Sequence, residues 1–121
     1  MAETLNFTLS SSVVSGSTTL PSFNPPFSFS DVNLQQHSSD KVVIAAAQSD
    51  FAISLDGMTG RYVFLKFDND VSVKLNGTGN TAIALAAGAS SPAGLLIVGG
   101  AVTSVHVTTT VQTICEKFIA T

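Results

Sequence analysis

Residues 61–77 read RYVFLKFDNDVSVKLNG and carry the clearest structural signal in the chain. The first seven are rich in β-branched and aromatic side chains and are apolar on both faces near the middle, which is typical of a central strand buried on two sides. Residues 68–70 (Asp-Asn-Asp) are turn formers. Residues 71–75 alternate apolar and polar side chains, and Asn76-Gly77 is a hairpin turn dipeptide. The segment therefore predicts two consecutive strands.

The same spacing of strands and turns continues on both sides of this segment. Further strands are expected from alternation or short apolar runs at residues 42–44, 51–55, 81–85, 95–98 and 101–107. Turns fall about every ten residues, as in sandwiches and barrels, and no helical segment of about 10 to 15 residues separates the strands. We therefore expect an all-β fold, an antiparallel β-sandwich or barrel, over residues 41–121.

The C-terminal segment fits both a helix and a strand. A helical stripe would comprise Val111, Ile114, Cys115, Phe118 and Ile119. The β-branched run from Thr108 to Val111 loses rotamer freedom in a helix and favours a strand. We predict a final strand within residues 111–119.

Residues 1–40 differ in composition from the rest of the chain, because they hold three of the four prolines and many serines. Leu5, Phe7 and Leu9 alternate with polar residues, which predicts one strand within an extended N-terminal arm. Proline favours extended backbone, and the phenylalanines are large apolar anchors without a local packing partner. The arm residues expected to bind a partner are Phe7, Phe23, Pro25, Pro26, Phe27 and Phe29. Their target is either the arm's own domain or a neighbouring chain.

Charged side chains are scarce. Five basic and eight acidic residues among 121 amount to 11% and give a net charge of −3, whereas ordinary soluble domains carry about 25% charged residues. This balance excludes nucleic-acid binders, coiled coils and disordered acidic tails. Twenty-nine serines and threonines predict a largely neutral hydroxyl surface. With so little charge to protect sheet edges, we expect permanent partners; a stable monomer is the alternative.

The sequence offers no signal for secretion or for a membrane span. Glu3 stands where a signal peptide would carry a basic residue. Residues 81–102, the most apolar stretch, are interrupted by glycine, serine and proline, so no membrane span is expected. Cys115 is the only cysteine, which excludes an internal disulfide and a thiolate metal cage.

The residues that could carry chemistry favour structural roles. Residues 68–70 lack the glycine and closing glutamate of a calcium loop, which favours a turn. His106 has no strand-turn-helix nucleophile elbow to serve, and His37 is expected in a solvated loop. Residues 77–79 lack the lysine of a phosphate loop. Cys115 is expected to be a small buried hydrophobe. We therefore expect no enzyme, and no catalytic, cofactor or metal site.

Three segments together suggest a family. Residues 62–77, 94–100 and 102–107 run strand, Asn/Asp turn, strand with Asn-Gly, apolar strand ending in glycine, then a further alternating strand. This order resembles the small β-sandwich virion proteins of tailed bacteriophages over roughly residues 60–110. The resemblance implies a non-enzymatic, jelly-roll-like protein that decorates a capsid or builds neck, tail or fibre-base rings as a homo-oligomer.

The expected function is therefore a structural role in a virion, assembled in the host cytoplasm. The leading hypothesis is a capsid decoration or cement protein that forms a homotrimer or larger ring and binds the major capsid protein or other virion proteins, with no nucleic acid, membrane or cofactor. The alternatives are a neck, tail or fibre-base component, or a carbohydrate-binding module for host adsorption. Tyr62 is the only aromatic residue with a polar tip, and tryptophan is absent, which argues against the carbohydrate module.

Overall fold

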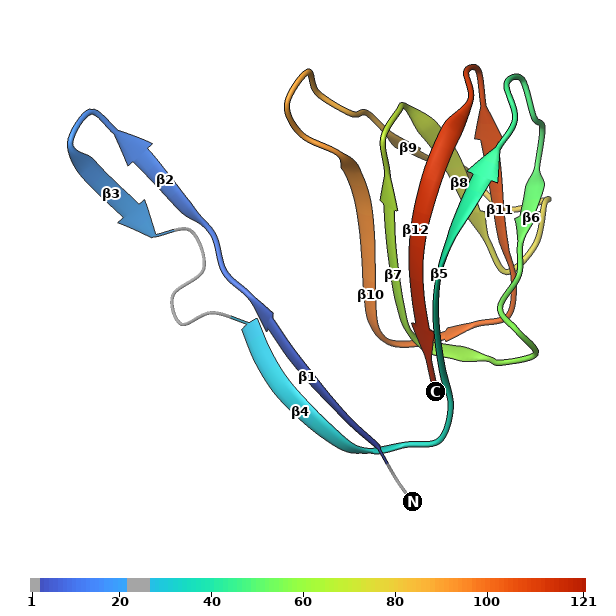
Figure 1. Cartoon of the computed structure of the whole chain (residues 1–121), viewed down its shortest axis with the longest axis horizontal. Coiled ribbons are helices and arrows are strands. Elements are labelled where there is room, and N and C mark those ends of the chain that lie inside the picture. The colour runs from blue at the N-terminus through green and yellow to red at the C-terminus, as the bar shows by residue number, and fades with distance from the viewer. Residues whose placement is uncertain (1–2, 22–26) are drawn as a thin grey trace. The chain divides into compact units, whose positions relative to one another are not determined.

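The computed structural model describes residues 3–21 and 27–121. Every regular element in these residues is a β-strand, and all strand pairs are antiparallel (Figure 1). The predicted all-β, antiparallel fold class is thus confirmed. The chain divides into two compact units, Met1–Gln35 and Gln36–Thr121.

The first unit is a ribbon of paired strands. It contains β1 (Glu3–Leu9), β2 (Ser12–Ser15), β3 (Thr18–Pro21) and β4 (Phe27–Leu34). β1 pairs with β4 and β2 pairs with β3, so the two pairs are nested along one hairpin path. The chain reverses between β2 and β3 at Gly16, whose φ of 63° lies in the left-handed region.

This unit differs from the expected arm of residues 1–40 with a single strand. The strand expected around Leu5 to Leu9 is part of β1, but three more strands follow, and the unit ends at Gln35. A two-stranded ribbon needs no fully buried face, so its strands do not have to show the apolar alternation by which strands are recognised in a sequence. Because β2 and β3 are rich in serine and threonine, the sequence did not indicate that these segments are paired strands.

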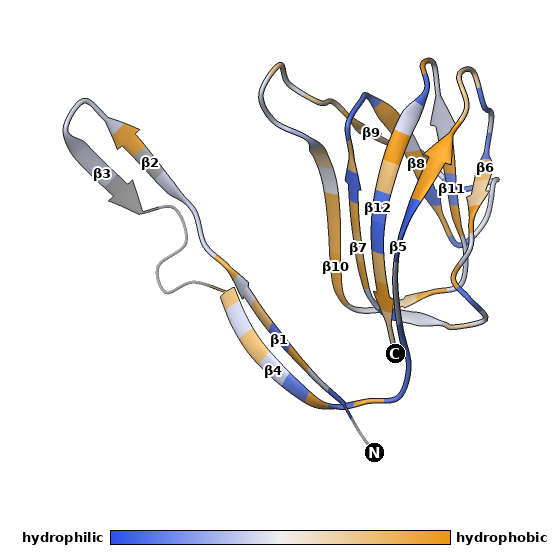
Figure 2. Ribbon diagram, in the orientation of Figure 1, coloured by the Kyte–Doolittle hydropathy of each residue, from blue (hydrophilic) through white to orange (hydrophobic). Residues whose placement is uncertain are grey.

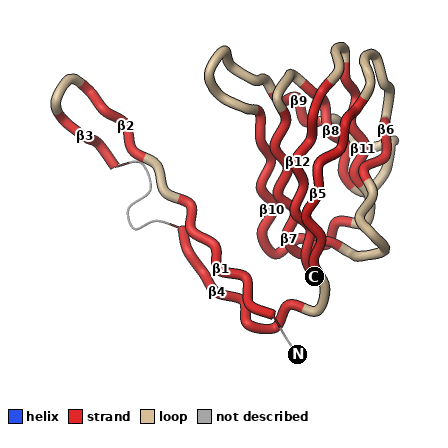
Figure 3. The backbone as a smooth tube through the Cα atoms, viewed as in Figure 1, coloured by secondary structure: helices blue, strands red, loops and turns tan. Residues whose placement is uncertain are grey.

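The second unit contains two four-stranded sheets (Figure 3). Its strands are β5 (His37–Ile44), β6 (Phe51–Ile53), β7 (Gly60–Phe67), β8 (Val71–Leu75), β9 (Ile83–Leu85), β10 (Ala93–Val102), β11 (Val105–Thr109) and β12 (Thr113–Ala120). One sheet has the order β10-β7-β12-β5 and the other the order β6-β11-β8-β9. This arrangement is sandwich-like, with the core between the two sheets.

The core draws alternate residues from both sheets. The first sheet contributes Ile44, Val63, Leu65, Phe67, Cys115 and Ile119, and the second contributes Ile53, Val71, Val73, Val105 and Val107. Because successive strand residues point to opposite faces, the residues between these positions face outward. Figure 2 shows alternating hydropathy along β12 and hydrophobic colour along much of β10.

The turn predicted at Asn76-Gly77 is confirmed, since these residues have φ values of 62° and 138°. A further turn follows β6 at Asp56 and Gly57, which have φ values of 53° and 79°. Asparagine, aspartate and glycine are the residues that accept positive φ most readily. Asn76 Oδ1 also accepts a hydrogen bond from the Thr103 amide at 2.7 Å, which joins this turn to the connection between β10 and β11.

Most strand predictions in the second unit are also confirmed. Residues 61–67 and 71–75 form β7 and β8, and the C-terminal segment is the strand β12 and not a helix. The expected strand at residues 101–107 was wrong in its limits, because β10 continues through Val102 and β11 begins at Val105. The described part of the chain holds no helix long and apolar enough to cross a membrane.

One charged side chain points into the sandwich. Lys117 lies on β12 between the core residues Cys115 and Ile119, and its side chain is 3% exposed. Its Nζ donates to the Ser54 carbonyl at 2.6 Å and lies 3.5 Å from Asp56 Oδ2. A hydrogen bond from Ser38 and the positive charge of Lys117 lower the pKa of Asp56. The amine is thus buried with acceptors for its protons.

Candidate functional site

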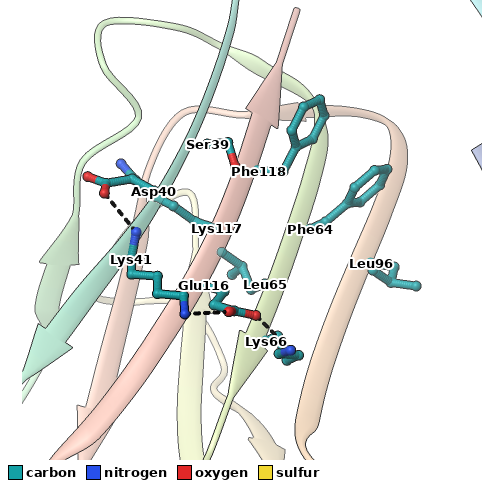
Figure 4. Close-up of a pocket in the computed structure, with 10 residues that line it drawn as sticks. All are labelled: Ser39, Asp40, Lys41, Phe64, Leu65, Lys66, Leu96, Glu116, Lys117 and Phe118. Carbon is teal, nitrogen blue, oxygen red and sulfur yellow. Dashed lines mark hydrogen bonds and ion pairs between the residues drawn. The ribbon is translucent and has the colours of Figure 1, made fainter. Parts of the chain in front are cut away.

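The outer face of the sheet β10-β7-β12-β5 carries aligned rows of side chains. The strand register places Leu96 of β10 beside Phe64 of β7, and Phe64 beside Phe118 of β12. The two phenylalanine rings stack with centroids 5.4 Å apart and an angle of 20° between their planes (Figure 4). Leu96 is 48% exposed. We call Leu96, Phe64 and Phe118 the apolar row.

A charged row crosses the same face next to the apolar row. In the register, Glu116 of β12 lies between Lys66 of β7 and Lys41 of β5. Its two carboxylate oxygens lie 2.7 Å from Lys66 Nζ and 3.1 Å from Lys41 Nζ (Figure 4). Hydrogen bonds from Lys66 and Lys41 lower the pKa of Glu116. Exposed ion pairs of this kind add little to stability, so the row mainly fixes the side chains in place.

The two rows border a hollow of about 570 Å³. Figure 4 shows Phe64, Phe118 and Leu96 on one side of the hollow and the charged row on the other. Volumes of this size are in the range of small-ligand sites, but such sites are mostly enclosed by their walls. Here the lining comes from neighbouring strands of a single sheet. The arrangement fits contact with another surface better than enclosure of a small molecule.

Exposed apolar residues extend this face beyond the rows. They are Val43 at 58%, Leu96 at 48%, Ile114 at 42% and Val98 at 38% exposure, and each lies on one of the three strands β5, β10 and β12. Among the described residues 36–121, no third layer of strands lies over this sheet. The charged row separates Val43 and Ile114 from Leu96 and Val98, so the exposed apolar side chains form two groups on this face. Exposed apolar groups on a sheet face are candidate interaction sites.

The expected arm residues are brought together in part. Phe7 lies opposite Phe29 in the β1/β4 register, and their rings stack with centroids 5.3 Å apart. Phe27 meets Phe7 and Phe29 edge-on at 6.2 Å and 6.0 Å. The ribbon thus carries a cluster of three phenylalanines on one face. Phe23, Pro25 and Pro26 lie outside the described residues.

The acidic residues at 68–70 form the expected turn. Asp68 Oδ1 accepts a hydrogen bond from the Ile114 amide, and Asp70 Oδ1 accepts one from the Ala87 amide, each at 2.8 Å. The carboxylates therefore hold backbone groups of neighbouring segments. No group of three or more potential metal ligands occurs among the residues that the structure describes.

The two histidines lie on strands. His37 was expected in a solvated loop, but it begins β5, and its ring stacks on Phe118 with centroids 6.3 Å apart. The β12 pairing extends to the last residues of the chain and draws His37 into the sheet. His106 lies on β11, and within the described residues its Nδ1 is buried without a hydrogen-bond partner.

Two further expectations concern Cys115 and Tyr62. Cys115 is fully buried, as expected, and burial raises the pKa of its thiol to about 11. Tyr62 is only 3% exposed. Its ring therefore does not offer a platform for a sugar.

Sequence reasoning missed the apolar row. Leu96 lies within an apolar run that predicted a strand without indicating which residues face outward, and the strand at residues 61–67 was expected to be buried on both faces. Only the register between β10, β7 and β12 shows that the three side chains align.

Comparison with known proteins gives no match to a family, to a curated protein or to a solved structure.

Proposed function

We propose that this chain is a non-enzymatic structural component of a tailed-bacteriophage virion, most simply a capsid decoration or cement protein with a jelly-roll-like sandwich. It acts by packing against identical copies and against the major capsid protein or other virion proteins. The resemblance of residues 60–110 to small virion proteins supports this role. The neck, tail and fibre-base positions are variants of the same role.

The observation that carries this proposal is the combination of exposed apolar surface with very low charge. Residues 75–115 contain no aspartate, glutamate, lysine or arginine, and this segment supplies the exposed residues Leu96, Val98 and Ile114. Soluble proteins that act alone carry many charged residues of both signs on their surface and avoid such patches. A protein that is permanently part of an assembly does not need this surface charge, because its partners cover the apolar surface.

The phenylalanine cluster of the first unit supplies a second contact. A two-stranded ribbon has little stability by itself in water and gains it by packing on another surface. Phe27 is 47% exposed, so burying the rest of its surface contributes about half of the roughly 1.5–3 kcal/mol that a fully exposed side chain of this size would gain. Repetition of this contact around a symmetric assembly multiplies its effect through the high local concentration of neighbouring sites.

The proposal is tested first by the mass of the full-length chain in solution. Light scattering or sedimentation should give a multiple of 12.4 kDa. Because the contacts are apolar, association should persist at about 1 M salt, where the screening length is only about 3 Å. A monomer at every concentration, up to the solubility limit, contradicts a role in self-assembly.

The virion role needs its own measurement. An antiserum against the chain should label purified particles of the virus that encodes it, and mass spectrometry should find the chain in a fixed ratio to the capsid subunit. Particles that lack the chain contradict this role. If the chain self-associates but is not found in particles, it is a self-assembling protein that acts elsewhere than in the virion.

A further inference from the structure

The four edge strands of the two sheets differ in how open they are to another strand. The edge strands β6 and β9 have three residues each. β5 and β10 are long, with eight and ten residues. An edge strand exposes unpaired backbone donors and acceptors, and proteins protect long edges with charges, prolines or bulges. The two long edges are therefore the ones to compare.

β5 is protected by charge. Asp40 and Lys41 lie in its middle, and the Lys41 amide donates a hydrogen bond to Asp40 Oδ1 at 2.7 Å. This amide is therefore occupied by a side chain and not by a strand. An incoming strand at this edge would displace that bond and meet two charged side chains.

β10 has no such protection over most of its length. Residues 93–98 contain no charge and no proline, and they pair in regular register with β7 on one side. Pro92 precedes this segment, and a register shift after Val98, with Gly99 at a φ of 76°, ends it. Within the described residues β7 is the only strand that pairs with β10. Six residues thus present an uncharged open edge.

We propose that β10 pairs with β10 of a second copy, antiparallel and about a two-fold axis, so that two sheets join into one sheet of eight strands. Pairing of an exposed edge with a further strand is a common mode of protein recognition. A second copy fits this edge because β10 carries no charge that two-fold symmetry would place opposite itself. In the register described next, small residues of one β10 strand also lie opposite large residues of the other.

The register that keeps the outer faces continuous pairs residues of the same parity, because neighbouring residues point to opposite faces. Centred on Leu96, near the middle of the open segment, it places Leu96 opposite Leu96 of the second copy and Gly94 opposite Val98. A glycine opposite an exposed valine leaves room for the larger side chain. On the core-facing side, Leu95 lies opposite Ile97.

This register also joins the apolar rows of the two copies. Leu96 stands at the end of the row, beside Phe64 and Phe118. Across the two-fold axis the two rows meet end to end at Leu96. The contact therefore packs Leu96 and Val98 of the two copies beside each other and creates one apolar surface across both copies. That surface is the continuous face on which a larger partner could lie.

The pairing does not depend on the virion role. It does require that the number of copies in the assembly be even. A two-fold contact combined with a three-membered ring gives six copies. The copy number therefore separates this inference from the proposed function, which any homo-oligomer satisfies.

Cross-linking tests the register in the full-length chain. In the proposed pair, opposite Cα atoms lie about 4.5–5.5 Å apart, which a disulfide spans. Leu96→Cys should form a covalent dimer of twice the chain mass on mild oxidation. Val43→Cys is the matched control, because Val43 is an exposed apolar residue at the opposite edge of the same sheet. Equal or slower cross-linking of Leu96→Cys than of the control overturns the register.

A charge substitution tests the contact itself. Leu96→Lys places like charges opposite each other at the axis and should reduce the mass of the assembly by half. Ile114→Lys, on β12 of the same outer face, should leave the copy number even. Circular dichroism of both variants checks that they fold. An odd copy number in the unmodified chain, or an unchanged mass in Leu96→Lys, overturns the pairing and leaves the proposed function standing. A monomer overturns both.

Discussion

Lys117 Nζ donates a hydrogen bond to the backbone carbonyl of Ser54 at 2.6 Å, so an amine from β12 of one sheet reaches the segment after β6 of the other. The bond spans 63 residues of sequence. At Lys117 the two sheets are joined by a polar contact, whereas the neighbouring inward residues of β12, Cys115 and Ile119, make apolar contacts. The strength of this contact can be measured by substitution.

Lys117→Ala should destabilise the second unit by about 2–4 kcal/mol, because it removes the charged donor of the part-buried bond to the Ser54 carbonyl and opens a cavity where the buried side chain lay. Lys117→Met should cost less, since it keeps the packed stem of the side chain. Lys66→Ala, an exposed lysine, is the control and should cost less than about 1 kcal/mol. Urea unfolding measures all three. A cost for Lys117→Ala no larger than the control shows that the bond is immaterial.

Asp56 should make stability depend on pH in the acid range. Its pKa is lowered in the folded chain by a hydrogen bond from Ser38 and by the charge of Lys117. A lowered folded pKa means that the contribution is complete above the unfolded pKa of about 3.9 and is lost as the pH falls through the folded value. Asp56→Asn should give a shallower decline of unfolding free energy below about pH 4. Parallel curves for the two proteins contradict this assignment.

Truncating a side chain on β12 should lower the free energy of unfolding much more on the core-facing side of the strand than on its outer side. Ile119 is fully buried and Ile114 is 42% exposed. Ile119→Ala should destabilise the unit by roughly 2–5 kcal/mol, as buried aliphatic truncations do. Ile114→Ala, on the opposite face of the same strand, should cost less than about 1 kcal/mol. Thermal or chemical unfolding distinguishes them, and similar costs for both would show that the outer face is also tightly packed.

The phenylalanine cluster should govern self-association without affecting the fold of the second unit. Phe27→Ser removes a member of the cluster and should weaken association by at least about tenfold, since each tenfold corresponds to about 1.4 kcal/mol. Val32→Ser, at an exposed residue of the same strand β4, serves as control. Sedimentation over a concentration series gives the dissociation constants. Equal constants for Phe27→Ser and the unmodified chain remove the cluster from the contact.

The sequence was sufficient for the fold class because residues 61–77 contain complete local signals, two strands and two turns. Which side chains of β12 face outward could not be predicted in the same way. Its inward positions include Lys117 and Thr113, and its outward positions include Phe118 and Ile114. Neither set is purely apolar, so alternation alone cannot say which face is buried. Only pairing with β7 and β5 decides it.

The ribbon of the first unit was hard to predict for a different reason. The residues that pair between β1 and β4 are 18 to 31 positions apart in the sequence, and no short turn joins the two strands directly. Pairing between distant segments depends on contacts that a local pattern does not contain. The phenylalanines were recognised as anchors, but the stacking of Phe7 on Phe29 follows from the register alone.

The single thiol offers an internal probe of breathing motions. Cys115 is sealed between the sheets, and with a pKa of about 11 almost none of it is ionised near neutrality. Alkylating reagents attack the thiolate, so the native chain should resist them until the two layers separate. The rate of modification at increasing urea then reports that opening event in the unaltered polypeptide, with no fluorophore or engineered label.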